Sequence, residues 1–131
     1  MDETQIIHSL QNALDNVLGI YLFGSRIQGT YHPESDLDIA VLVAGFVPPE
    51  TRFQLANELA ESMGIEVDLV DLRAASTVMA AQVLQTGKRI WAKNPEADTF
   101  EAAVMSDKMA LDRARAPLLA EIQQRGSIYG R

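Results

Sequence analysis

The chain contains no cysteine, so disulfide bonds and thiolate chemistry are excluded. Its apolar runs are far shorter than the roughly 20 residues that cross a bilayer as a helix. The acidic start, MDETQIIHSLQ, has neither the basic flank nor the apolar core of a signal peptide. Positive charge is also scarce: the formal net charge is −7, which argues against a general basic surface for long nucleic acids. These absences predict a cytoplasmic protein that contacts no membrane and binds no nucleic acid directly.

The composition that remains is that of one folded domain. The 131 residues are 47% hydrophobic and 22% charged, ordinary values for a globular chain. We expect a single domain over residues 1–131, with a core at about 18–92 and a helical segment at about 95–126. Charge divides unevenly, because the residues from Asp107 onward carry +2 and the first 106 carry −9. The basic tail is most simply a solvated helix face, and contact with an acidic partner is the alternative.

Apolar periodicity predicts alternating helices and strands. The predicted helices cover about 3–16, 49–63, 74–86 and 95–125, and the predicted strands about 20–23, 36–43, 65–72 and 88–92. Gly19 is expected to end the first helix, and Pro117 either kinks the last helix or separates two. This order predicts an α/β or α+β fold in which a small mixed sheet has helices packed on one side, plus C-terminal helices.

Two carboxylates stand at the mouth of a hydrophobic strand in the segment YLFGSRIQGTYHPESDLDIAVL. A strand alternates its side chains, so Asp36 and Asp38 share one face while Leu37 enters the core. Paired carboxylates suit Mg²⁺, which binds one or two of them together with substrate phosphates. If the strand IEVDLVDL is a neighbour, Asp68 supplies a third carboxylate. Three carboxylates can hold the two ions of a two-metal site.

A glycine–serine pair precedes these acids by ten residues. Gly24 allows the backbone to approach a phosphate closely. Ser25 offers a hydroxyl group and an N–H at the start of a short helix, and Arg26 can pair with a phosphate. The sequence therefore predicts a site that binds phosphate at one end and metal at the other.

Gly24-Ser25, ten residues and then Asp36-x-Asp38 resemble the signature of the DNA polymerase β-like nucleotidyltransferases. The small size and the later EVDLVDL look like the minimal nucleotidyltransferase (MNT) branch, whose members are commonly antitoxins paired with a HEPN-domain ribonuclease toxin. The resemblance covers roughly Ile20 to Leu72. It implies a nucleotidyltransferase fold that uses ATP and Mg²⁺.

The resemblance also implies an activity and residue roles. AMP would pass from ATP to a tyrosine hydroxyl of the toxin and block RNA cleavage, in a hetero-oligomer of the two proteins. By position, Gly24 and Ser25 would hold the triphosphate, Asp36 and Asp38 would bind both metal ions, and Asp68 would activate the attacking hydroxyl. The acceptor residue, the base preference and the stoichiometry stay open.

Other interpretations stay open beside this one. Asp36 and Asp38 alone could be solvated charges at a strand entrance, and Glu66 points the same way as Asp68. The protein could be an antitoxin that acts by contact alone, or an enzyme that modifies a small molecule. Thr30 and His32 lie in the loop before the acids, and the sequence assigns them no role.

Overall fold

The structure, a computed structural model, describes residues 2–29 and 35–128. Thr30 and His32 therefore lie outside the described residues. Four strands form one mixed sheet in the order β3-β2-β1-β4, in which β1 is antiparallel to β2 and β4, and β2 is parallel to β3. The strands are β1 (Val17–Phe23), β2 (Leu37–Val43), β3 (Val67–Asp71) and β4 (Lys88–Ala92). The predicted small mixed sheet is confirmed.

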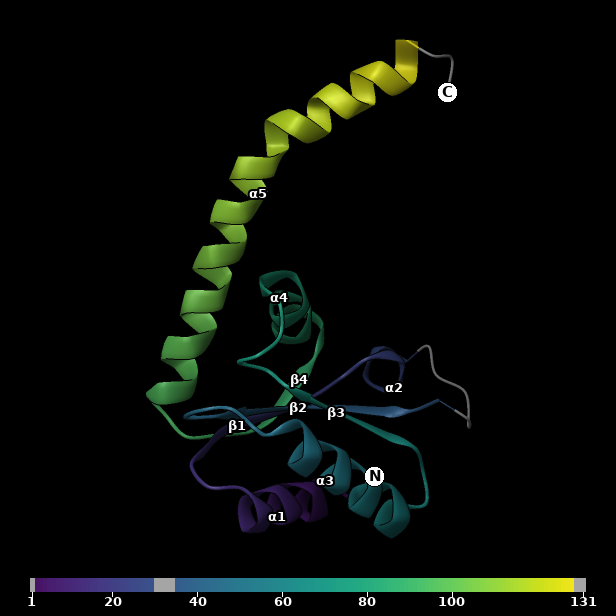
Figure 1. Ribbon diagram of the computed structural model, residues 1–131, viewed down its shortest axis with the longest axis vertical. Coiled ribbons are helices and arrows are strands. Elements are labelled where there is room, and N and C mark those ends of the chain that lie inside the picture. The colour runs from purple at the N-terminus through teal and green to yellow at the C-terminus, as the bar shows by residue number, and fades with distance from the viewer. Residues whose placement is uncertain (1, 30–34, 129–131) are drawn as a thin grey trace.

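Five helices connect and cover these strands (Figure 1). They are α1 (Glu3–Ala13), α2 (Ser25–Gln28), α3 (Pro49–Met63), α4 (Thr77–Thr86) and α5 (Glu96–Ile128). α1 and α3 pack on one face of the sheet, while α4 and the start of α5 cover the other face, so the predicted packing of the helices on one side is wrong. The second layer is needed because the strands are apolar on both sides. Leu37 and Ile39 face α1 and α3, whereas Ala40 and Leu42 face α4.

The first helix is shorter than predicted. It ends at Ala13, and Val17 and Leu18 belong to β1, where Val17 pairs with Val43. Gly19 lies inside this strand, so its predicted role as a helix stop is wrong. A Cβ on Gly19 would lie 2.8 Å from the Tyr21 hydroxyl oxygen, which explains a glycine at this strand position.

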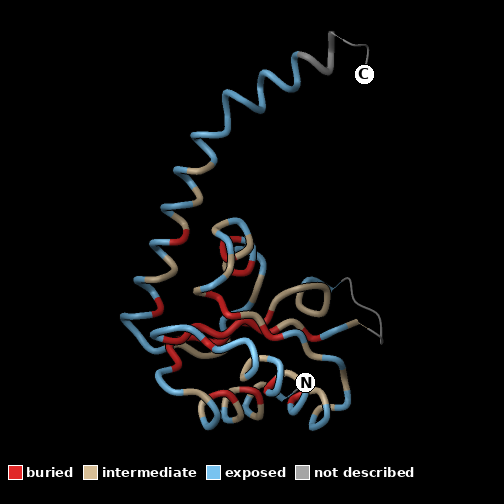
Figure 2. Tube along the Cα trace, in the orientation of Figure 1, coloured by how far each residue is buried: buried red, intermediate tan, exposed pale blue. Residues whose placement is uncertain are grey.

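The last helix is continuous through Pro117, so the alternative of two separate helices is wrong. Figure 1 shows that α5 bends along its length and that its C-terminal half projects from the body. Figure 2 shows the buried residues concentrated in and around the sheet, while this half of α5 is largely exposed. The large exposed apolar side chains of α5 include Met109, Leu118, Leu119 and Ile122. No helix among the residues described here is both long and apolar enough to span a membrane.

A polar cluster attaches the start of α5 to the sheet. The Tyr21 hydroxyl donates to Glu101 at 2.9 Å, and Arg89 of β4 pairs with Glu101 at 2.8 Å and with Asp98 at 2.7 Å. Burial raises the pKa of Tyr21, and the hydrogen bond to Glu101 raises it further. The tyrosine is therefore a neutral donor at physiological pH, and the cluster fixes α5 over β1 and β4.

Asp71, at the end of β3, has a structural function. Its buried carboxylate accepts the N–H of Val47 at 2.8 Å and the N–H of Arg73 at 3.2 Å. Asp71→Ala should lower the free energy of unfolding by about 1–3 kcal/mol, because a buried N–H loses its acceptor. Asp68→Ala, an exposed aspartate on the same strand, should change it by less than about 0.5 kcal/mol. Urea denaturation of both variants measures the difference, and equal losses would contradict this role for Asp71.

Candidate active site

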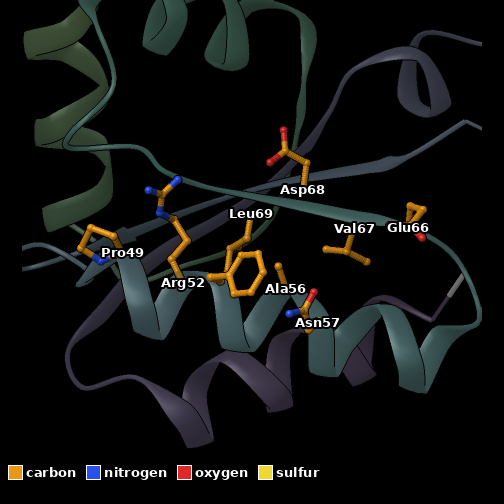
Figure 3. Close-up of a pocket in the computed structure, with 9 residues that line it drawn as sticks. Pro49, Arg52, Ala56, Asn57, Glu66, Val67, Asp68 and Leu69 are labelled. Carbon is orange, nitrogen blue, oxygen red and sulfur yellow. The ribbon is translucent and has the colours of Figure 1, made fainter.

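Two aspartates from neighbouring strands lie side by side. Asp38 of β2 and Asp68 of β3 are register partners in the parallel pair. Their strand neighbours Leu37 and Leu69 pack into the core beneath, so both carboxylates lie on the opposite face of the sheet. Figure 3 shows the Asp68 carboxylate pointing away from α3. The prediction of a shared site required β2 and β3 to be neighbours, and the structure shows that they are.

Asp36 is the third member of the group. It is exposed, immediately before β2, two residues from Asp38 along the extended chain. Burial raises the pKa of Asp38, and the charges of Asp68 and then Asp36 raise it further. The structure therefore brings the three predicted carboxylates close enough for their charges to act on one another. Glu66 is exposed at the entrance to β3, two residues before Asp68.

Gly24 lies next to Asp38 at the end of β1. It follows Phe23, which pairs with Asp38, and its φ of +81° is a conformation that side chains other than glycine rarely adopt. A Cβ here would lie 2.0 Å from Asp38 Oδ2. The Gly24 carbonyl accepts the N–H groups of Ile27 and Gln28 at 3.1 Å, and thereby fixes the single turn of α2, which Ser25 begins.

Gly24→Ala should therefore impair catalysis far more than stability. The new methyl group would displace the Asp38 carboxylate, and a misplacement of about 1 Å at a reacting centre costs roughly 100-fold in rate. Gly29→Ala is the matched control, since Gly29 also has a positive φ, +79°, but a Cβ there meets no atom within 4 Å. Backbone strain should cost Gly29→Ala about 1–2 kcal/mol of stability. It should cost Gly24→Ala about 1–3 kcal/mol, because the ψ of −166° at Gly24 lies outside the left-handed helical region. Transfer rates and thermal unfolding of the pair test this, and a similar loss of rate in both would contradict it.

Arg26 occupies a supporting position. Its Nε donates to the Ser35 carbonyl at 2.8 Å, so it ties α2 to the residue before Asp36. This contact keeps the glycine–serine turn next to the acids. Contact between Arg26 and a phosphate stays a prediction.

The donor chemistry fits a hard divalent cation. All three side chains present carboxylate oxygens, the ligands that Mg²⁺ prefers. Because Gly24 has no side chain, the Asp38 carboxylate can lie directly against the turn that starts α2. Within residues 2–29 and 35–128, no three His, Cys, Asp or Glu side chains are gathered tightly enough to form a preassembled metal cage. That arrangement agrees with Mg²⁺, which takes few protein ligands and completes its shell with water and phosphate.

A hollow adjoins Asp68 on the outer side of β3. Arg52 of α3 lines it together with Asp68 (Figure 3). Phe53 of α3 also belongs to its lining. Arg52 was not predicted as a site residue, because nothing in its local pattern separates it from a solvated residue in the first turns of an amphipathic helix. Only the packing of α3 against β3 places it next to Asp68.

Comparisons with known proteins agree with this geometry. The family model described as polymerase beta, nucleotidyltransferase matches residues 4–96. The protein adenylyltransferase MntA of Shewanella oneidensis is 38% identical over 122 residues, which cover 93% of this chain and 88% of the relative. A crystal structure of a toxin–antitoxin with AMP-PNP matches with a TM-score of 0.85 and 38% identity, over 94% of this chain and 99% of that one.

A second solved structure shows a modified partner. It contains the tri-AMPylated Shewanella oneidensis HEPN toxin in complex with an MNT antitoxin. The match has a TM-score of 0.78 and 35% identity, and it covers 92% of this chain and 95% of that chain. The likeness extends over β1–β4 and most of α5, so it includes the projecting helix as well as the acidic site.

Proposed function

Because this chain belongs to the polymerase β nucleotidyltransferase family, we propose that it is a Mg²⁺-dependent protein adenylyltransferase. Its acceptor is a tyrosine hydroxyl of a HEPN-domain RNase toxin, and the transferred AMP neutralises that toxin. The protein is thus the antitoxin of the pair and forms a hetero-oligomer with its toxin. One observation carries the proposal: the 38% identity to MntA over 93% of the chain.

The site residues have two proposed roles, which are to bind the triphosphate and to bind metal ions. Gly24 and Ser25 hold the triphosphate of ATP, and Arg26 supports them from α2. Asp36, Asp38 and Asp68 hold two Mg²⁺ ions, which supply charge neutralisation at the phosphates. The single domain over residues 1–131 contains all of these groups, in the core at about 18–92.

Transfer then consists of one displacement at the α-phosphorus. The acceptor oxygen forms a bond to this phosphorus, and the bond between the phosphorus and the oxygen that bridges to the β-phosphate breaks. AMP becomes esterified to the acceptor, and pyrophosphate leaves. Asp68 takes the hydroxyl proton, because it lies beside Asp38 yet is exposed to the incoming group. Positioning and charge neutralisation dominate such a step.

The test uses purified protein, α-labelled ATP, Mg²⁺ and the HEPN-domain protein proposed as its partner. We expect label on the HEPN protein, release of pyrophosphate and loss of its RNase activity. Removing Mg²⁺ with EDTA should stop the labelling. If the HEPN protein stays unlabelled while its RNase activity is still blocked, the antitoxin acts by contact and the proposed function is wrong.

A further inference from the structure

The site residues follow one another across three neighbouring strands of the sheet. Gly24 lies at the end of β1, Asp38 on the next strand β2, and Asp68 on β3, which is the edge strand. In phosphoryl transfer the attacking and leaving oxygens lie roughly in line on opposite sides of the phosphorus. If the triphosphate lies at Gly24, pyrophosphate leaves toward β1. The acceptor must then arrive from the side of Asp68 and the free edge of β3.

A groove lies on that side of the site. It runs between β3 and α3, has a volume of about 500 Å³, and includes Asp68 in its lining (Figure 3). Phe53 and Asn57 of α3 line its other wall. Because β3 is an edge strand, its outer backbone groups have no strand partner in this sheet. The groove therefore offers an approach to Asp68 that the triphosphate does not occupy.

Two side chains in the groove are unsatisfied: an apolar ring is exposed to solvent, and a buried N–H has no hydrogen-bond acceptor among the described residues. Phe53 is 71% exposed although its ring is apolar. Arg52 has a buried Nε that finds no hydrogen-bond partner among the residues described. Buried donors are nearly always paired in folded proteins, so this exception calls for a water molecule, an ion or a bound group beside the Arg52 guanidinium. An aromatic ring and an arginine in one pocket are also the residue types that dominate binding energy at protein interfaces.

We propose that this groove binds the segment of the toxin that carries the acceptor tyrosine. Phe53 contacts an apolar or aromatic side chain of that segment, and Arg52 donates to one of its oxygen atoms. Because the Asp68 carboxylate points away from α3, the tyrosine side chain of the bound segment passes over the edge of β3, and its hydroxyl then lies beside Asp68. This inference rests on the proposed function and adds to it the surface by which the acceptor is recognised.

Steady-state transfer to the HEPN protein tests the groove. Phe53→Ala and Arg52→Ala should each raise KM for the HEPN protein by about tenfold or more, because truncating an interface anchor typically has this effect. KM for ATP should change by less than about threefold, since neither side chain lies on the β1 side of the site. Phe53→Ala removes an exposed side chain, so its result does not depend on correct refolding of a buried residue.

Phe46→Ala is the matched control. Phe46 is 68% exposed, like Phe53, but it lines a neighbouring hollow that shares Pro49 and Arg52 with the groove and does not include Asp68. It should leave KM for the HEPN protein unchanged. If Phe53→Ala and Arg52→Ala behave like Phe46→Ala, or if all three raise KM equally, the assignment of the acceptor to this groove is overturned.

A binding measurement separates this inference from the proposed function. Calorimetric titration of the HEPN protein with wild type and with Phe53→Ala, without ATP, measures binding alone. The affinity of Phe53→Ala for the HEPN protein should be about tenfold lower than that of wild type. If wild type transfers no AMP, the proposed function fails whatever the groove does. If wild type transfers AMP and the groove variants bind and react normally, the groove assignment alone fails.

Discussion

The double variant Asp36→Asn/Asp38→Asn should lose at least about 1000-fold of the transfer rate, because removing one such charged group commonly costs 100-fold or more. Both changes preserve the size of the side chain and remove its negative charge. The measurement is incorporation of label from ATP into the HEPN protein under single-turnover conditions. Transfer at the wild-type rate would show that these residues are not the metal-binding pair.

The same variant should be at least as stable as wild type. The pKa of Asp38 is raised, mainly by burial and then by the charges of Asp68 and Asp36, so the folded state disfavours the ionised carboxylate. Because the folded protein holds this proton more tightly than the unfolded chain, stability from this group falls as pH rises above its ordinary value of 3.8. Near pH 7 the ionised carboxylate is therefore a net cost, which asparagine removes. Thermal unfolding without Mg²⁺ checks this, and a large loss of stability would contradict it.

The double variant also distinguishes an enzyme from an antitoxin that acts by contact. It keeps Arg52 and Phe53 of the groove, so it should still bind the HEPN protein. If AMP transfer neutralises the toxin, cells that express the variant with the toxin should stop growing. Protection equal to that of wild type would favour inhibition by contact, with the acids unused.

The acidic site was predictable from the sequence because it is mostly local. Strand alternation places Asp36 and Asp38 on one face, and the turn at Gly24 follows from residue type. The pairing of Asp38 with Asp68 is different, because it depends on β2 and β3 being neighbours, which pairing between distant segments decides. No local pattern in the sequence shows that β2 and β3 are adjacent. The family resemblance implied it through the role it gives Asp68.

The errors of prediction have the same origin. Gly19 looks like a helix stop, but pairing of Val17 with Val43 extends β1 through it. Each predicted helix has one apolar face, which is compatible with a single helical layer. The strand β2 is apolar on both sides, so the sheet needs a helical layer on each face. Arg52 was missed because its position beside the groove arises only when α3 packs on β3. Long-range packing therefore decided each of these three features.

Asp68→Asn should reduce kcat by about 100- to 10,000-fold, the range for loss of a general base. Asparagine retains an oxygen that can face a metal ion but cannot accept the hydroxyl proton. We therefore expect ATP to bind with nearly unchanged affinity while the chemical step slows. Glu66→Gln is the control, since Glu66 is the exposed acid two residues earlier on the chain, and its kcat should stay near that of wild type.

The pH profile gives an independent check on the role of Asp68. Without a base at position 68, the reaction needs an acceptor that is already ionised, and an unperturbed tyrosine ionises with a pKa of about 10. The rate of Asp68→Asn should therefore rise roughly tenfold per pH unit between about pH 7 and 9, more steeply than that of wild type. A parallel profile for both proteins would mean that Asp68 holds metal only, because a ligand that takes no proton would lower the rate equally at every pH.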